Sequence, residues 1–181
     1  MSEGIPADGF QGIQKAEFIE NVDEYIKSQD EAYEIIFNRL HQKFTSYKSL
    51  ELRYTSQHNA LQAKIPGIEK ALEVLLYMKS NPAKKDIECD FELITGTYTT
   101  VSLNNTGTIF LWIGANLMVE YPINEALELL NSNKDNAEKA INSLKAGLKF
   151  LQEQIVIVQV SLARLHNWAV VNRQKLVANV K

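Results

Sequence analysis

The sequence predicts an α+β protein, mainly α, built as a long antiparallel two-helix coiled coil with two β-hairpins at its base. Residues typical of β-strands are confined to positions 87–121, where Thr, β-branched and aromatic residues alternate with groups of turn-forming residues such as Gly and Asn. On both sides of this region, apolar residues recur three and four positions apart, as they do in coiled-coil seams. The two flanks are similar in length, so we expect them to pack antiparallel.

The first 29 residues are predicted to be a flexible segment that contains one short amphipathic helix. Phe18, Ile19, Val22, Tyr25 and Ile26 have the i, i+3, i+4 spacing of a helix with one apolar face. Such a helix either packs back on the nearest long helix or binds a partner. Packing back is the more common arrangement.

The first long helix is predicted over residues 30–79, and Pro66 and Gly67 interrupt it. In a helix interior the Pro costs about 3 kcal/mol and the Gly up to about 1 kcal/mol. Two structures therefore compete. Pro66 either separates two helices of a compact bundle or lies within one kinked helix. The apolar spacing continues from Leu61 to Leu75 without a break in phase, which favours one kinked helix.

The second long helix is predicted over residues 123–174, with residues 175–181 as a tail. Its seam alternates spacings of three and four without error from Leu127 to Ala169. Lys134 is the only polar residue in that seam. Residues 155–160 alone would pass for a strand, but the unbroken spacing through them indicates a helix.

The strand region is predicted to form two hairpins arranged as an antiparallel meander, with turns at Thr95-Gly96 and at residues 114–116. Residues 109–113 are apolar at every position, so this strand needs cover on both faces. Either the helices of this chain fold over both faces, or other chains supply the missing cover, as we infer. The residues expected to take part in subunit assembly are Phe91, Leu93, Val101, Leu103, Ile109, Leu111, Ile113, Leu117 and Val119.

The antiparallel register places Tyr33 near Val171, at the end of the coiled coil far from the hairpins. This end carries more apolar residues than a two-helix seam can bury, and soluble proteins usually keep such surfaces for partners. The alternative is that residues 18–26 fold back over it as a short three-helix bundle. A cover that moves aside is compatible with both. The predicted binding residues at this end are Tyr33, Ile36, Phe37, Val156, Ile157, Val160, Trp168, Val170 and Val171.

Composition and charge argue against two classes of partner. The chain has 181 residues, a formal net charge of −3 and a pI near 5.7, which offer no broad attraction to nucleic acid or to anionic membranes. Cys89 is the single cysteine, so an intrachain disulfide is excluded. The first thirty residues lack the pattern of a signal sequence, and we expect a cytoplasmic protein.

The sequence also lacks the patterns of common enzyme sites. Neither Thr95-Gly96-Thr97 nor Thr106-Gly107-Thr108 has the spacing or the Lys of a phosphate-binding loop. The three histidines, at positions 41, 58 and 166, are scattered and have no metal-ligand spacing with the one cysteine. We therefore predict no catalytic residue, no cofactor and no metal, and a protein that is not an enzyme.

The chain resembles the α-type subunits of prefoldin. The resemblance is carried by residues 110–121, FLWIGANLMVEY, and by the Ile123-Asn124-Glu125-Ala126 that follows. Supporting matches are Ile65-Pro66, Ala163-Arg164 with Asn167-Trp168, and residues 18–23. The likeness spans about residues 18–168, and its Gly-Ala-Asn hairpin is the most specific part.

This resemblance implies a prefoldin-like fold and a hetero-hexamer of two α-type and four β-type subunits, whose hairpins join into a β-barrel platform. It implies ATP-independent capture of unfolded polypeptides, actin and tubulin above all, at the coiled-coil tips, and their delivery to the cytosolic chaperonin. The apolar residues far from the hairpins would then bind clients, and those of the hairpins would hold the subunits together. The alternative is a self-associating coiled-coil scaffold or tether.

Overall fold

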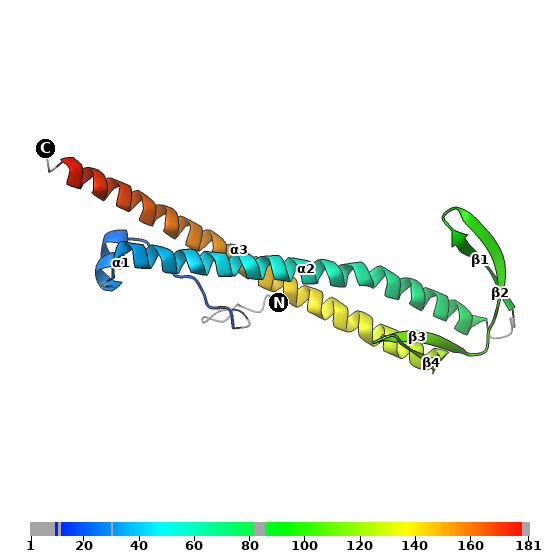
Figure 1. Cartoon of the computed structure of the whole chain (residues 1–181). Helices are drawn as coiled ribbons and strands as arrows, with labels where there is room; N and C mark the ends of the chain where they lie inside the picture. The colour runs from blue at the N-terminus through cyan, green and yellow to red at the C-terminus, as the bar shows by residue number, and fades with distance from the viewer. Residues whose placement is uncertain (1–9, 11, 30, 82–85, 179–181) are drawn as a thin grey trace. The chain divides into compact units, whose positions relative to one another are not determined.

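The computed structural model describes residues 10, 12–29, 31–81 and 86–178. Three helices and two β-hairpins follow one another along the chain (Figure 1). This mainly helical architecture confirms the predicted fold class. In chain order the elements are α1 (Val22–Gln29), α2 (Tyr33–Ser80), β1 (Asp86–Ile94), β2 (Thr97–Asn104), β3 (Thr108–Gly114), β4 (Leu117–Pro122) and α3 (Ile123–Ala178).

The chain divides into two compact units. Unit 1 comprises Met1–Asn59 and Asn142–Lys181, and unit 2 comprises Ala60–Ile141. Each unit has its own core, formed where α2 and α3 pack against each other. Pro66 lies within α2, which is one helix from Tyr33 to Ser80, in agreement with the preferred alternative.

The core of unit 1 is built by three segments, because residues 10–29 pack against both long helices. Phe150, Leu151 and Val158 of α3 are almost fully buried, and Tyr47 and Tyr54 of α2 pack against them. Nearer to α1, Ile36, Leu40 and Leu165 form a second buried cluster with Ile19 and Val22. The alternative in which the N-terminal segment folds back is therefore the arrangement found.

The fold of the N-terminal segment differs from the predicted helix over residues 18–26. Only Val22–Gln29 is helical, and Asn21 caps this helix by accepting a hydrogen bond from the Asp23 N–H at 3.1 Å. Residues 14–19 belong to neither a helix nor a strand. In them and their neighbours burial recurs at every third residue, at Ile13, Ala16, Ile19 and Val22. The predicted flexibility of residues 1–9 lies outside the described residues.

The core of unit 2 is smaller and lies where α2 and α3 meet the second hairpin. Leu72 and Leu75 of α2 pack against Ile123, Ala126 and Leu127 of α3. Further along α3, the Lys134 ammonium lies 2.7 Å from the Glu69 carboxylate and 3.9 Å from that of Glu138. The one polar residue of the predicted seam thus pairs across the two helices, and its hydrogen bond to Glu69 raises the pKa of Lys134.

The predicted turns are correct, but the predicted meander is wrong. The strands form two separate two-stranded antiparallel sheets, β1–β2 and β3–β4. The segment between β2 and β3 is held by helix ends: the Asn105 side chain donates to the Met78 carbonyl at 3.1 Å, and the Ile123 N–H donates to the Gly107 carbonyl at 3.1 Å. The chain therefore starts β3 against the helices instead of beside β2. The second turn uses positive φ at Ala115 and Asn116, 49° and 58°.

The predicted tail begins too early. Helix α3 continues to Ala178, four residues beyond the predicted end, because Gln, Lys, Leu and Ala after residue 173 are good helix formers and no Gly or Pro intervenes. The rest of the predicted tail, residues 179–181, lies outside the described part of the chain. Among the described residues, none of the helices is long and apolar enough to span a membrane.

Candidate functional site

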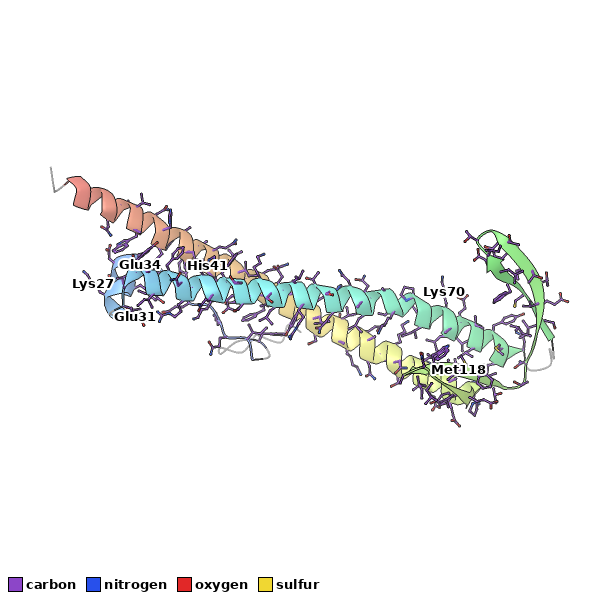
Figure 2. All side chains as sticks on the ribbon, viewed as in Figure 1. Lys27, Glu31, Glu34, His41, Lys70 and Met118 are labelled. Carbon is purple, nitrogen blue, oxygen red and sulfur yellow. The ribbon has the colours of Figure 1, made fainter. Side chains whose placement is uncertain are left out.

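Hairpin β3–β4 has an outward apolar face made by three large side chains. Trp112 pairs with Met118 across the hairpin, and Phe110 lies on the same face, opposite Glu120. The exposed fractions are 62% for Phe110, 65% for Trp112 and 45% for Met118, the last of which is labelled in Figure 2. A two-stranded sheet with an uncovered apolar face is marginal in water, so this face is a candidate for contact with another chain.

The opposite face of the same hairpin belongs to the core of unit 2. Ile109 and Leu111 alternate with Phe110 along β3, and they pack with Tyr121 against the α2–α3 cluster. Ile109 and Leu111, which are predicted to take part in subunit assembly, are half-buried against the helices of their own chain, and their part in assembly stays a prediction. The alternative in which these helices cover both faces is wrong, because Phe110 and Trp112 are exposed. Of the other predicted residues, Ile113 and Leu117 are exposed beside the turn and Val119 is half-buried.

Phe110, Trp112 and Met118, which form the outward face, are not among the residues predicted from the sequence to take part in assembly. Strand β3 is apolar throughout, so its own residues do not reveal which face is turned inward. A signal was present in β4, where Glu120 lies on the same face as Phe110. A carboxylate is not buried in a core without a partner, so the face that carries Glu120 is the outward one.

Hairpin β1–β2 is amphipathic and carries the remaining predicted assembly residues. Phe91, Val101 and Leu103 lie on one face, since Phe91 pairs with Thr99, Cys89 with Val101 and Ile87 with Leu103. Acidic residues alternate with them along β1 and occupy the other face. Phe91 and Leu103 are 55% and 47% exposed, and Leu93 is exposed at the register shift beside the turn. This second apolar face is also uncovered by the described residues of the chain.

The binding residues predicted at the far end of the coiled coil all fall in unit 1, with different degrees of exposure. Val156, Val160, Val170 and Val171 of α3 are 38–56% exposed. Tyr33, Phe37, Ile157 and Trp168 are half-buried, and the rings of Tyr33 and Trp168 stack with centroids 6.3 Å apart. The predicted partner of Tyr33 was Val171, about one helical turn further along. Ile36 is fully buried, so for this residue the predicted accessible surface is wrong: Ile19 and Val22 cover it.

Side chains of the long helices hold the main chain of the N-terminal segment. The Tyr47 hydroxyl donates to the Gln14 carbonyl at 2.9 Å. Further along, the Ala16 N–H donates to Gln154 Oε1 at 2.8 Å, and the Ile19 N–H donates to Ser161 Oγ at 3.3 Å. Arg164 donates to the carbonyls of Ile19 and Glu20 at 3.1 Å, and Trp168 Nε1 donates to the Asp23 carboxylate at 2.6 Å.

The contact at Tyr47 gives unit 1 a pH dependence above neutrality. Burial raises the pKa of the Tyr47 hydroxyl above its ordinary value of 10.0. The unfolded state therefore loses this proton first, and the Tyr47 contribution to stability, present below about pH 10, is lost as pH rises through the folded pKa. The phenolate also cannot donate to Gln14. We expect thermal unfolding of the wild type to shift down more steeply between about pH 9 and 11 than that of Tyr47→Phe.

The comparison with Tyr47→Phe isolates this effect, because the other titrating groups are common to both proteins. Equal pH slopes for the two would show that Tyr47 does not contribute.

The described residues hold no cluster of metal-binding side chains, and His41 packs between aromatic rings. No group of three or more His, Cys, Asp or Glu side chains that could hold a metal ion occurs among the described residues. His41, also labelled in Figure 2, lies between Phe37 and Phe44 with ring centroids 6.3 and 6.4 Å away.

Comparison with known proteins identifies the family. The Prefoldin family model, described as prefoldin subunit, matches residues 47–168. Prefoldin subunit 3 of Mus musculus is 36% identical over 91% of this chain and 85% of its own length. Prefoldin subunit 3 of Saccharomyces cerevisiae is 31% identical over 92% of this chain and 88% of its own length.

Among solved structures, the filamentous PFD of Methanocaldococcus jannaschii aligns with a TM-score of 0.43 at 16% identity, covering 61% of this chain and 96% of that one. The assignment rests on the sequence comparisons, which extend over both hairpins and most of both long helices. The chain belongs to the prefoldin subunit family.

Proposed function

We propose that this chain is an α-type subunit of a hetero-hexameric prefoldin, which holds unfolded polypeptides without ATP and passes them to a chaperonin in the cytoplasm. The prefoldin family is a chaperone family and not an enzyme family. Two α-type and four β-type subunits would form the complex, and unfolded actin and tubulin are the proposed clients. Neither nucleic acid nor membrane is among the proposed partners.

The observation that carries the assembly part of this proposal is the uncovered apolar face of β3–β4. Phe110, Trp112 and Met118 expose about half or more of their side chains on a hairpin whose other face is already used by the helices. Burying large apolar side chains contributes about 1.5 to 3 kcal/mol each. Hairpins of neighbouring subunits offer the same strand chemistry, so joining them covers these faces and completes larger sheets.

The client part of the proposal rests on an exposed stripe along α3 that is apolar at every position but Asn167. Val156, Val160, Ala163, Asn167 and Val170 are spaced four and three residues apart, and all five are exposed. This is the spacing of a coiled-coil seam without a partner among the described residues of the chain. Apolar segments of an unfolded polypeptide fit such a stripe weakly, and several subunits on one platform would add their contacts.

The client surface can be tested by making Val156→Ser, Val160→Ser, Val170→Ser and Val171→Ser together. We expect the complex to assemble normally but to bind chemically unfolded actin about tenfold or more weakly, since a few kcal/mol of apolar burial are lost. The measurement is suppression of actin aggregation on dilution from denaturant, as a function of complex concentration.

A matched control replaces exposed polar residues of the same helix, Gln152→Ser, Gln159→Ser and His166→Ser. This control should hold actin as well as the wild type does. If the valine variant suppressed aggregation with equal efficiency, the client surface would have to lie elsewhere.

The same exposed hairpin faces are compatible with a self-associating scaffold or tether. The mass of the chain purified alone separates the two proposals. A prefoldin subunit should form its defined complex only with β-type subunits, whereas a scaffold should form a defined homo-oligomer by itself.

A further inference from the structure

The N-terminal strap, residues 12–21, is bound through its main chain as well as through apolar side chains. Five of its main-chain groups are hydrogen-bonded by side chains of α2 and α3: the carbonyls of Gln14, Ile19 and Glu20 and the N–H groups of Ala16 and Ile19. These groups are common to every polypeptide, whatever its sequence. The contacts therefore recognise an extended chain as such.

The α3 residues that hydrogen-bond residues 12–23 include a regular row: Gln154 and Ser161 accept from strap N–H groups, and Trp168 donates to the Asp23 carboxylate. Gln154, Ser161 and Trp168 are seven residues apart, so they occupy the same heptad position on successive double turns of the helix. Gln154 and Ser161 are 2% and 0% exposed, and they are the only buried polar residues among the described residues. Buried amide and hydroxyl groups are unfavourable unless they are hydrogen-bonded, and here strap N–H groups supply those bonds.

Between these polar contacts the groove accepts apolar side chains at a fixed interval. Ile13, Ala16 and Ile19 of the strap, followed by Val22 at the start of α1, are at most 9% exposed. They pack on the two clusters that α2 and α3 form in unit 1. Phe18, which lies between the buried Ala16 and Ile19, is 48% exposed. The Arg164 guanidinium carbon lies over its ring, 4.8 Å from the ring centroid. The groove thus combines main-chain contacts with apolar pockets three residues apart.

We propose that this groove is a binding site for unfolded polypeptide in an extended conformation, and that the strap is its internal competitor. The inference rests on the proposed function and adds a second client-binding site, distinct from the exposed stripe of α3. An extended client segment with apolar residues at every third position would replace the strap on Gln154, Ser161 and Arg164. It would gain access to Ile36 and Leu165, which the docked strap and α1 cover.

The competition follows from simple linkage. A client can enter the groove only in the fraction of molecules whose strap is undocked, so its apparent affinity is reduced by that fraction. Because the strap is tethered to the groove, it competes at a high effective concentration. Weakening the strap without changing the groove should therefore strengthen client binding.

The strap is released by Ala16→Pro with Ile19→Pro, which removes both N–H donors and leaves every groove residue in place. The matched control is Lys15→Pro with Glu17→Pro, at neighbouring exposed positions. All chains are studied in the assembled complex. Protease cleavage within residues 12–21 reports whether the strap is undocked, and the probes are chemically unfolded actin and a fluorescent peptide with the sequence of residues 10–29.

We expect the released variant to bind both probes about tenfold or more tightly than the wild type, while the control matches the wild type. A released strap, shown by cleavage, with unchanged affinity for unfolded actin and for the peptide would overturn the inference while client holding itself remained. If neither the wild type nor the variant held actin, the proposed function would fail instead.

A second pair of variants tests main-chain recognition in the groove. In the released background, Gln154→Leu should weaken binding of both probes about fivefold, because one hydrogen bond to the bound chain is lost. Gln152→Leu is the matched control, since the same substitution falls on an exposed position of the same helix. Equal or tighter binding by Gln154→Leu relative to this control would show that the groove does not recognise the main chain.

Discussion

We expect that replacing Phe110, Trp112 and Met118 together by Ser abolishes co-assembly with the proposed β-type partner subunits. These side chains form the outward face of β3–β4, and their substitution leaves the inward residues Ile109 and Leu111 in the core of unit 2. If each side chain contributes about 1.5 to 3 kcal/mol when buried between subunits, the triple variant loses about 5 kcal/mol or more per chain. A loss of that size weakens association by more than about a thousandfold.

Size-exclusion chromatography with light scattering measures this effect, because the complex and the free chain differ greatly in mass. The matched control is Val156→Ser with Val160→Ser and Val170→Ser, which also removes three exposed apolar side chains but in unit 1. It should assemble as the wild type does. A complex of normal mass that contains the hairpin variant would refute the role of this face.

We expect Phe150→Ala to destabilise unit 1 by about 3 to 5 kcal/mol. Phe150 is 1% exposed, and its ring lies 6.0 Å from that of Phe10, between centroids, in the cluster that joins α2, α3 and the N-terminal segment. Truncation removes the buried ring and leaves a cavity that the surrounding helices can only partly close. Urea titration measures the loss of stability. The fluorescence of Trp168 reports the unfolding of unit 1 if Trp112, the only other Trp, is replaced by Phe.

Lys149→Ala is the control for this substitution, since Lys149 is the exposed neighbour of Phe150 in the same helix. It should change the urea midpoint little. If Phe150→Ala unfolded at the same urea concentration as Lys149→Ala, the side chain would not lie in a packed core.

The long helices and their pairing could be predicted because their signal is repeated many times. The unbroken seam from Leu127 to Ala169 outweighs the strand-like residues 155–160, and α3 is helical throughout. The same repetition fixed the register within about one turn, as the stacking of Tyr33 on Trp168 shows. The continuous apolar spacing also predicted that α2 extends through Pro66, where helix propensity alone predicts a break.

The faces of β3 could not be predicted from β3 itself. In a strand whose residues alternate between apolar and polar, the apolar residues identify the buried face. Residues 109–113 are apolar at every position, so they do not identify it. The connection through Asn105 and Gly107 decides the matter, because it anchors the start of β3 to the ends of α2 and α3. Ile109 and Leu111 are thereby turned into the core, and Phe110 and Trp112 are left outward. The same anchoring separates the hairpins that were expected to pair.

The predicted helix over residues 18–26 was wrong in its first part for a related reason. Phe18, Ile19 and Val22 fit a helical spacing, yet Phe18 is exposed and burial recurs every third residue from Ile13 to Val22. This three-residue burial pattern depends on the surface of α2 and α3 on which the segment packs, so the segment's own sequence does not reveal it. The heptad interval of Gln154, Ser161 and Trp168 is visible in the sequence of α3, but nothing there indicates that Gln154 and Ser161 bind main-chain N–H groups and Trp168 the Asp23 carboxylate.

The family, the two long helices, their register and the positions of both turns follow from the sequence alone. These properties arise from patterns between near neighbours or from repeats along one helix, which one chain displays in full. The outward face of β3–β4 and the path of residues 12–21 over α2 and α3 become visible in the folded chain. Those choices depend on contacts between residues far apart in sequence, such as Ala16 with Gln154, where a few hydrogen bonds and buried side chains select one arrangement.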